Sequence, residues 1–169
     1  MNKTLWIMAG IPGSGKSYFA QHYLMKGNTW AYISRDVIRF SIITNEDEYF
    51  SKEDHVFNTF IENINDCLLD NVHTNIIADA THINWASRKK LLNHLHLDNV
   101  KVNIVWMQTD YLTCVARNTE REGRARVSPN VLWDMYNRYV HPYEDKYKYN
   151  AIYDAYADGE MYKHGKVQI

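Results

Sequence analysis

The chain alternates between short apolar runs and longer stretches in which apolar residues recur every three or four positions. The short runs are nearly continuous in apolar residues, which is typical of strands buried on both faces of a parallel sheet. They lie at residues 4–9, 30–33, 75–79 and 101–107. We therefore predict four parallel strands.

The longer periodic stretches predict helices between and after these strands. The predicted helices cover residues 17–26, 36–43, 52–72, 84–97 and 110–122. A further helix is expected to begin at Pro129, because proline favours the first helical position. The acidic residues 46–48 predict a loop.

The alternation of strands with helices predicts an α/β fold of three layers, α/β/α, around a central parallel sheet. The length of 169 residues and the absence of repeats favour one domain over residues 1–169. The pattern weakens after Pro142. There, Asp158 and Gly159 separate two short strand-like runs, which indicates an edge hairpin within residues 143–169.

Composition excludes several classes of protein. Hydrophobic residues make up 46% of the chain and charged residues 23%, which is ordinary for a globular protein. The net charge of −1 gives no overall attraction to a polyanion, so a nucleic-acid site would have to be a local patch.

Cys67 and Cys114 lack metal-binding spacing, and no signal peptide or membrane span is indicated. We expect a cytoplasmic protein with no membrane partner, and its oligomeric state stays open.

Residues 10–17 read G-I-P-G-S-G-K-S and match G-x-x-x-x-G-K-[ST] in full. They lie between a predicted strand and a predicted helix, the context that such a phosphate-binding loop requires. In this loop Lys16 would neutralise the β and γ oxygens of ATP, and the Ser17 hydroxyl would bind Mg²⁺. The residues expected to bind ATP here are Gly10, Pro12, Gly13, Ser14, Gly15, Lys16 and Ser17.

Asp36 and Arg39 follow the second predicted strand at i, i+3 spacing, which places them on one face of a helix. We expect Asp36 to accept the proton of an acceptor hydroxyl, and Arg39 to hold an acceptor phosphate or the transferring group. The alternative is an acidic residue that interacts with the helix dipole beside a surface arginine. The position next to the phosphate-binding loop favours the catalytic interpretation.

Asp79 ends the third predicted strand, where doubly wound sheets place ligand-binding groups. We predict that Asp79 binds Mg²⁺, through water, and that the nearby Thr81 contacts the substrate. The alternative is that both residues are ordinary turn or capping residues.

Arginines are concentrated in residues 117–128, and we call this stretch the arginine segment. Its members are Arg117, Arg121, Arg124 and Arg126. Arginines on a mobile lid can stabilise a transferring phosphoryl group and exclude water, so we expect Arg117 and Arg121 to bind ATP and Arg121 to act in catalysis. The alternative is a solvated face paired with neighbouring glutamates.

The remaining aromatic and histidine residues predict no further site. Tyr136, Tyr139 and Tyr143 recur at helical spacing, so packing is expected rather than the stacking of nucleic-acid bases. His94 and His96, the closest pair of histidines, would point to different sides of a helix, so they predict no metal site.

Taken in order, these motifs resemble the P-loop kinase module of phage-type polynucleotide 5′-kinases and the related AAA_33-type ATP-binding kinases. The resemblance covers about residues 3–141. Its motifs are G-I-P-G-S-G-K-S at 10–17, S-R-D-V-I-R at 34–39, D-A-T-H-I-N at 79–84, R-N-T-E-R at 117–121 and S-P-N-V-L-W-D-M-Y at 128–136. It implies that Asp36 is the general base, that Arg39 contacts the acceptor's phosphate, that Arg121 is the lid arginine and that Asp79 helps to organise the site.

The resemblance implies transfer of the γ-phosphate of ATP, with Mg²⁺, to the 5′-hydroxyl end of a polynucleotide. One alternative is a small acceptor such as a nucleoside, sugar or antibiotic, which the acidic residues around 46–54 keep open. The other is a regulatory protein that binds ATP without transfer. The segment between Arg121 and Pro129 is about one residue longer than in the phage enzyme, so Arg124 and Arg126 receive no individual role. No D-x-D-x-T motif follows, so a fused 3′-phosphatase is not expected.

Overall fold

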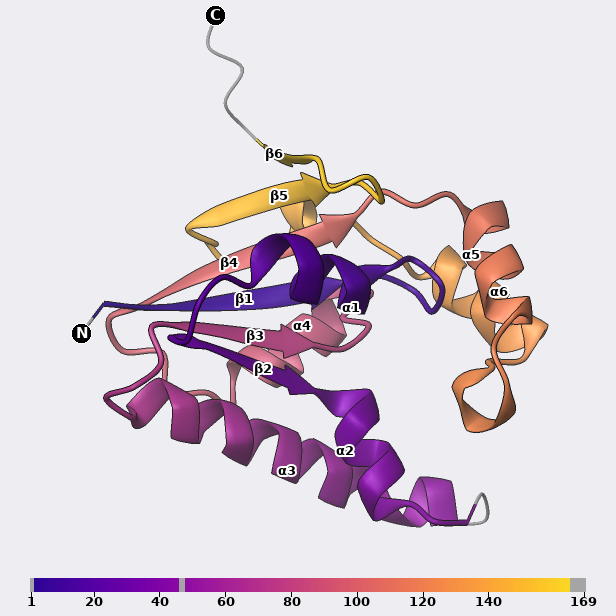
Figure 1. Ribbon diagram of the computed structural model, residues 1–169, viewed down its shortest axis with the longest axis horizontal. Coiled ribbons are helices and arrows are strands. Elements are labelled where there is room, and N and C mark those ends of the chain that lie inside the picture. Colours follow the sequence, from indigo (N-terminus) through magenta and orange to yellow (C-terminus); the bar gives the residue numbers. More distant parts are fainter. Residues whose placement is uncertain (1, 46–47, 165–169) are drawn as a thin grey trace, which may run out of the picture.

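The computed structural model describes residues 2–45 and 48–164 and shows an α/β fold around a mostly parallel sheet (Figure 1). The strands are β1 (Lys3–Ala9), β2 (Trp30–Ser34), β3 (Asn75–Asp79), β4 (Val100–Met107), β5 (Ala151–Ala155) and β6 (Met161–Lys163). Their order in the sheet is β2-β3-β1-β4-β5-β6, and only the pairing of β5 with β6 is antiparallel. Two residues of the predicted loop 46–48, Glu46 and Asp47, and the end of the predicted hairpin segment lie outside the described residues.

Helices connect the strands. They are α1 (Lys16–Phe19) with the π-helical turn η1 (Ala20–Leu24), α2 (Arg35–Ile42), α3 (Tyr49–Leu69), α4 (Trp85–Leu92), α5 (Tyr111–Thr119) and α6 (Pro129–Asn137). Two short 3₁₀ turns are η3 (Gly123–Ala125) and η4 (Pro142–Glu144). In Figure 1, α5 and α6 lie beyond the carboxyl ends of the strands, and α1 lies in front of the sheet.

The two faces of the sheet are covered by different helices. On one face, apolar residues of α3 and α4 pack on β1 to β4, as Phe60 and Leu91 do, in the largest buried cluster. On the other face, Phe19 and Leu24 of α1 and η1 cover Met8 and Val105. The predicted architecture of a parallel sheet between helical layers is confirmed.

The helix predicted for residues 84–97 ends early, at Leu92. The reason is a side chain from another helix: the amide of Asn65 in α3 donates a hydrogen bond to the His94 carbonyl (3.0 Å) and accepts one from the His96 N–H (2.9 Å). Asn65 thus replaces the helical partners of both groups. Apolar residues still recur at helical spacing in the sequence after Leu92, because the chain that follows the helix also packs on the core.

The helix predicted for residues 52–72 is shifted toward the N-terminus and ends at Leu69. Asp70 stops it, because its carboxylate accepts hydrogen bonds from the N–H groups of Val72 (3.0 Å) and His73 (2.9 Å). Aspartate competes with helical hydrogen bonding in this way when it caps a turn.

Two other predicted helices also differ from their predicted extents. The one predicted for residues 17–26 is α-helical over one turn only, after which the Met25 N–H donates to the Ala20 carbonyl (2.9 Å) in the five-residue step of a π-helix. The one predicted for residues 110–122 ends at Thr119.

The hairpin predicted around Asp158 and Gly159 is present as β5 and β6, but β5 is also a fifth parallel strand of the main sheet, which the apolar pattern did not predict. β5 pairs in parallel with β4, with Tyr153 opposite Val105, and then turns into the antiparallel β6. The turn contains Asp158, whose side chain accepts the Glu160 N–H (3.0 Å), and Gly159 at a φ of 97°. Three of the five residues of β5 are only half-buried, so its apolar signal is weak.

A buried ion pair attaches α4 to the segment that leads into β5. The Arg88 side chain is fully buried and donates two hydrogen bonds of 2.6 Å to Asp145. It also donates to the carbonyls of His82 (2.8 Å) and Val140 (3.0 Å). The Tyr149 hydroxyl donates to Asp145 as well (2.6 Å). This charge is therefore both paired and hydrogen-bonded, as a buried charge must be.

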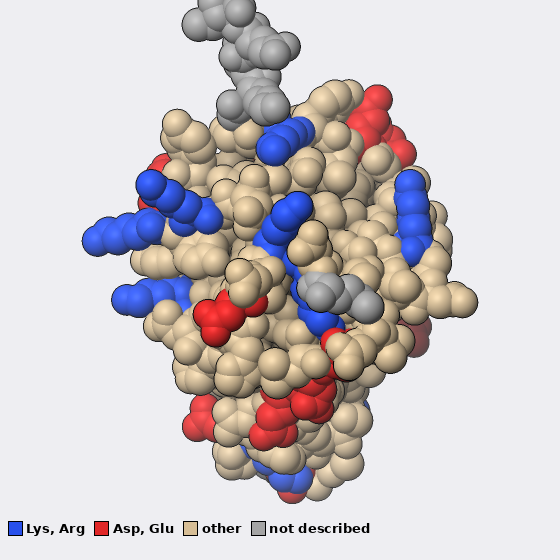
Figure 2. Space-filling view, turned by 90° about the vertical axis from the view of Figure 1, so that its left-hand side faces the viewer, with Lys and Arg blue, Asp and Glu red and all other residues tan. Residues whose placement is uncertain are grey.

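Figure 2 shows the end of the molecule where the parallel strands begin. Positive and negative side chains are interspersed on this face, in keeping with the net charge of −1. No helix in the described part of the chain is long and apolar enough to cross a membrane.

We predict that Arg88→Met destabilises the protein by about 3–5 kcal/mol, because it leaves the Asp145 carboxylate buried without its charged partner. The control is Arg138→Met, which removes an exposed i, i+4 pair with Asp134 and should cost less than about 1 kcal/mol. Urea unfolding of the three proteins measures the difference. Equal stabilities of the two variants would contradict the role of the buried pair.

Candidate active site

The loop between β1 and α1 has the backbone of a phosphate-binding loop. Gly13 and Gly15 adopt φ angles of 85° and 86°, a left-handed conformation that favours glycine. Gly13 also packs directly on the backbone of α5, since a Cβ atom there would lie 2.3 Å from the Cys114 carbonyl oxygen. Glycine is therefore required at this position for two independent reasons.

Side chains from α5 and the loop before it hold this backbone in place. The Thr109 hydroxyl donates to the Ser14 carbonyl (2.7 Å), and an Arg117 guanidinium nitrogen donates to the Gly13 carbonyl (3.3 Å). Arg117, which the sequence assigned to ATP, thus lies against the loop itself. The phosphate-binding N–H groups are presented by a backbone that is fixed before any ligand binds.

The strand ends beneath the loop are fixed by two aromatic side chains. The Tyr139 hydroxyl lies 3.0 Å from the carbonyl oxygens of both Ala9 and Met107 and can donate to either. His82 is buried and its Nδ1 lies 2.8 Å from the Met8 carbonyl, so this nitrogen carries the proton. Burial lowers the pKa of His82 to about 4, which keeps the ring neutral at pH 7.

The prediction that three tyrosines serve packing is correct for one of them. Tyr139 stacks on Trp106, with ring centroids 3.5 Å apart. Tyr136 and Tyr143 are 40% and 69% exposed. Tyr136 instead joins Tyr111 and Trp133 in an aromatic cluster on the outer side of α5 and α6.

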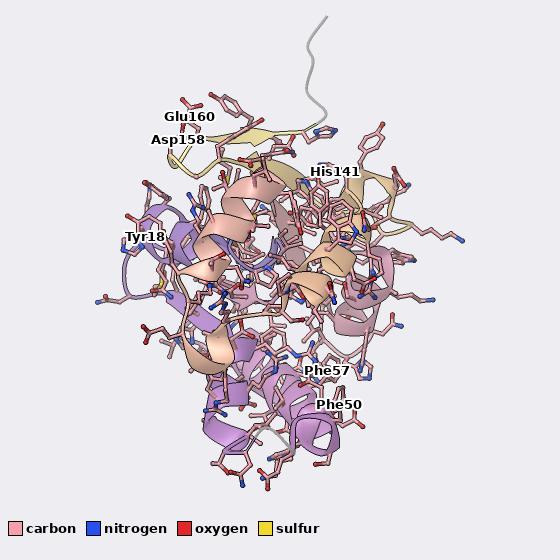
Figure 3. All side chains as sticks on the ribbon, turned by 90° about the vertical axis from the view of Figure 1, so that its right-hand side faces the viewer. Tyr18, Phe50, Phe57, His141, Asp158 and Glu160 are labelled. Atoms are coloured by element: carbon pink, nitrogen blue, oxygen red, sulfur yellow. The ribbon has the colours of Figure 1, made fainter. Side chains whose placement is uncertain are left out.

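A cavity of about 400 Å³ opens beside the loop, between the carboxyl ends of β2 and β3 and the arginine segment. Of the described residues that line it, six are cationic and one, Asp36, is a carboxylate. The cationic residues are Lys16, Arg35, Arg39, Arg121, Arg124 and Arg126. Figure 3 looks at this end of the molecule and shows α5 and α6 in front of the strand ends. The cavity suits an anionic ligand.

The residues predicted for catalysis and acceptor binding meet in this cavity, since Lys16, Asp36, Arg39, Thr81 and Arg121 all line it. Asp79 lies behind it at the end of β3, and Arg117 lies against the phosphate-binding loop. Of the other residues predicted in that loop, Pro12 lines the cavity, whereas Gly10, Gly13, Ser14, Gly15 and Ser17 do not.

Arg39 is held by two carboxylates. It forms an ion pair with Asp36, as the i, i+3 spacing predicted, and donates two hydrogen bonds to Glu53 in α3 (3.1 and 3.2 Å). Arg35 pairs with the same Glu53 carboxylate. Burial alone would raise the pKa of Glu53, but the hydrogen bond from Arg39 and the charges of both arginines outweigh it and lower the pKa.

Asp79 is almost fully buried, with an exposed fraction of 2%. The Tyr32 hydroxyl of β2 donates a hydrogen bond of 2.5 Å to its Oδ2 atom. Its Oδ1 atom is buried and has no hydrogen-bond partner within the described structure. An unpaired carboxylate oxygen is costly to bury, so its presence beside the phosphate-binding loop points to a ligand.

Within the arginine segment, Arg121 and Arg124 have different partners. Arg121 donates to the Ala125 carbonyl (3.4 Å) inside the segment. Arg124 reaches across the cavity, donates to the Ile43 carbonyl at the end of α2, and lies 5.2 Å from the centre of the Phe40 ring. In this arrangement the segment covers the cavity.

The sequence reasoning missed Glu53 and Tyr32. Glu53 was counted only as part of an acidic patch, and Tyr32 only as a strand residue. The i, i+4 spacing of Arg35 and Arg39 on one helix was a usable signal, because two adjacent cations need a carboxylate between them. For Tyr32 the sequence holds no such signal.

A second polar cluster lies at the sheet edge, on the side away from Tyr18 in Figure 3. Asp154 of β5 is contacted by His141 Nε2 (3.1 Å) and His164 Nδ1 (2.9 Å). The Tyr143 N–H donates to His141 Nδ1 (3.1 Å), so the proton of the neutral ring is on Nε2, which donates to Asp154. The cluster is thus a hydrogen-bonded contact that fastens the edge of the sheet.

A family model for an AAA domain, AAA_33, matches residues 5–142. The chain belongs to this family. The match includes every residue that lines the cavity, from the phosphate-binding loop and α2 to the arginine segment and α6. The chain is thus an AAA_33 domain with an intact phosphate-binding loop, which is the ATP-binding feature of P-loop proteins.

Solved structures share this fold. One, from a Pnkp1/Rnl/Hen1 RNA repair complex, is 21% identical, with a TM-score of 0.67 over 87% of this chain and 47% of that chain. A sugar kinase from Janibacter sp. HTCC2649 is 16% identical (TM-score 0.59; 91% and 86% covered), and a fungal RNA kinase is 11% identical (TM-score 0.58; 90% and 73%). The chain thus spans about half the length of the RNA repair protein. No curated protein matches the sequence itself.

We predict that Gly13→Ala weakens ATP binding by about one to two orders of magnitude, because the loop must move away from Cys114 to admit the new methyl group. The matched control is Gly27→Ala. Gly27 also has a positive φ, of 74°, but a Cβ atom there meets nothing within 4 Å. It should lose about 1 kcal/mol of stability and bind ATP normally. Calorimetric titration with ATP distinguishes the two, and normal ATP binding by Gly13→Ala would contradict the close-packing argument.

Proposed function

We propose that this protein is a kinase that transfers the γ-phosphate of ATP to the 5′-hydroxyl of a polynucleotide end. The observation that carries the proposal is the cavity beside the phosphate-binding loop, where six cationic residues surround a single carboxylate, Asp36. The ATP phosphates would take up Lys16 and Arg121, and a neutral sugar or nucleoside offers the remaining cations no countercharge. A nucleotide end offers a phosphate beside the reacting hydroxyl.

In this proposal Asp36 is the general base. Its side chain is 55% exposed and lies at the cavity, within reach of an entering hydroxyl. Arg39 would then hold the phosphate next to that hydroxyl. Because Glu53 already orients the Arg39 guanidinium, little side-chain entropy is lost when the acceptor binds.

The donor side uses the phosphate-binding loop. Lys16, which is 6% exposed and lines the cavity, would neutralise the β and γ oxygens. Arg121 lines the opposite wall and would stabilise the transferring group. Arg117, already against the loop, would contact the ATP phosphates from the side of α5.

Ser17 and Asp79 fit a Mg²⁺ site. Asp79 offers a buried, unpaired carboxylate oxygen, and oxygen ligands of this kind are what Mg²⁺ prefers. Ser17, the last residue of the loop motif, offers its hydroxyl. Mg²⁺ held by these residues would supply positive charge that offsets the negative charge on the transferring group. Thr81, at the cavity wall, would contact the acceptor.

The proposal also draws on the RNA kinase and RNA repair proteins that share the fold. The sugar kinase that shares it supports the alternative of a small acceptor. The enclosing contact of Arg124 with Ile43 limits the room above Asp36, which also suits a small acceptor. A protein that binds ATP without transfer remains the third candidate, and acceptor assays separate all three.

The test is transfer of labelled γ-phosphate from ATP and Mg²⁺ to 5′-hydroxyl DNA and RNA oligonucleotides. Nucleoside 3′-monophosphates, free nucleosides and sugars are offered in parallel. We expect oligonucleotides and nucleoside 3′-monophosphates to be labelled and free nucleosides to react poorly. Labelling of neutral acceptors alone would establish the small-molecule alternative. ATP binding without any labelled acceptor would establish the regulatory one.

We predict that Asp36→Asn lowers turnover at least about a hundredfold, the scale of losing a general base, while ATP still binds normally. Arg39 should stay in place in this variant because Glu53 holds it independently. Lys16→Ala is the contrasting variant and should lose ATP affinity and turnover together. Turnover and ATP binding are measured separately, and wild-type turnover by Asp36→Asn would remove Asp36 from the mechanism.

A further inference from the structure

Tyr32 connects the two sides of the candidate cation site. It lies on β2, which pairs in parallel with β3 so that Tyr32 is opposite Ile77 and Ser34 is opposite Asp79. Its hydroxyl therefore reaches two residues along the neighbouring strand, to Oδ2 of Asp79 at 2.5 Å. Figure 1 shows β2 and β3 side by side, with their carboxyl ends pointing toward the arginine segment.

This hydrogen bond gives the two oxygens of Asp79 different roles. Oδ2 is occupied by the phenol, whereas Oδ1 is buried without a partner in the described structure. A carboxylate with one oxygen fixed cannot rotate freely, so Oδ1 keeps one direction. Ligands that are oriented in advance bind a cation more tightly than ligands that must be ordered on binding.

The surroundings of the phenol favour its protonated form, which is the form that donates to Asp79. Burial, the charge of Asp79 and the hydrogen bond to it raise the pKa of Tyr32 to about 12. Gln21 in η1 and Ser17 in α1 lie close enough to the phenol for hydrogen bonds, which lower its pKa in part. Tyr32 therefore contacts Asp79 on one side and has Ser17 nearby on the other.

We propose that Tyr32 is a positioning residue for the divalent cation that accompanies ATP. It aims Asp79 Oδ1 at the cation and thereby sets the affinity for Mg²⁺, without touching the acceptor or the transferring group. The inference rests on the proposed assignment of Mg²⁺ to Ser17 and Asp79. A purely structural tyrosine would affect stability and leave the Mg²⁺ dependence unchanged.

The experiment is a Mg²⁺ titration of the full chain with a fluorescent, non-hydrolysable ATP analogue, and it requires no acceptor. Tyr32→Phe keeps the ring and removes only the hydroxyl. Mg²⁺ tightens binding of the analogue, and we expect Tyr32→Phe to raise the Mg²⁺ concentration that gives half of this effect about tenfold. Removing a residue that hydrogen-bonds to a metal ligand has an effect of at least about this size. Analogue binding in EDTA should be unchanged.

Two further variants define the effect. Tyr153→Phe removes a phenol from β5, two strands beyond β1 in the sheet, and should titrate like the wild type. In an Asp79→Asn background, Tyr32→Phe should have no additional effect, because the two residues act as one unit. Urea unfolding of each variant shows that the fold is retained.

An unchanged Mg²⁺ midpoint in Tyr32→Phe would overturn the role of Tyr32 and leave the proposed kinase reaction standing. An additional shift in the Asp79→Asn background would also overturn it, since Tyr32 would then act through another group. If analogue binding by the wild type did not respond to Mg²⁺ at all, both the cation assignment and the role of Tyr32 would be wrong. Failure to find an acceptor affects neither measurement.

Discussion

The backbone contact between the phosphate-binding loop and α5 is the constraint on which the site depends. Gly13 approaches Cys114 so closely that no side chain fits between them, and Thr109 and Arg117 hydrogen-bond to the same loop. The loop therefore cannot relax to satisfy its own N–H groups. The close approach also explains why Cys114 is fully buried, and burial raises the pKa of its thiol to about 11, so this cysteine is chemically inert.

On the proposed acceptor side, the equivalent constraint is the Glu53 carboxylate. It holds Arg35 and Arg39 together, although two neighbouring guanidinium groups would otherwise repel each other. Because the pKa of Glu53 is lowered, its ion pairs with Arg35 and Arg39 are intact at any pH above the ordinary pKa of a carboxyl group. They are lost only as the pH falls through the lowered pKa. Both halves of the site are thus ordered before substrates arrive, which is the condition for electrostatic catalysis.

The sequence predicted the features that depend on residues close together in the chain. Apolar runs located β1 to β4, and the loop motif located residues 10–17, because strand burial and the glycine requirement both depend on neighbours in the chain. Tyr32 and Asn65 could not be predicted, since each acts on a partner in another element. The spacing of Arg35 and Arg39 indicated that a carboxylate is needed between them but not that Glu53 supplies it. The roles of Tyr32, Asn65 and Glu53 depend on the register of β2 with β3 and on how α3 crosses α2 and α4. These contacts depend on tertiary structure and leave no periodic pattern in the sequence.

The contact of Arg124 with the Ile43 carbonyl links the arginine segment to the helix that carries Asp36. Ile43 follows α2 directly, so its carbonyl lies at the negative end of the helix dipole, where a guanidinium is favourable. The contact thus stabilises the end of α2. Because Asp36 and Arg39 lie within one turn of each other on α2, the arginine segment and the proposed acceptor residues are connected through a single helix.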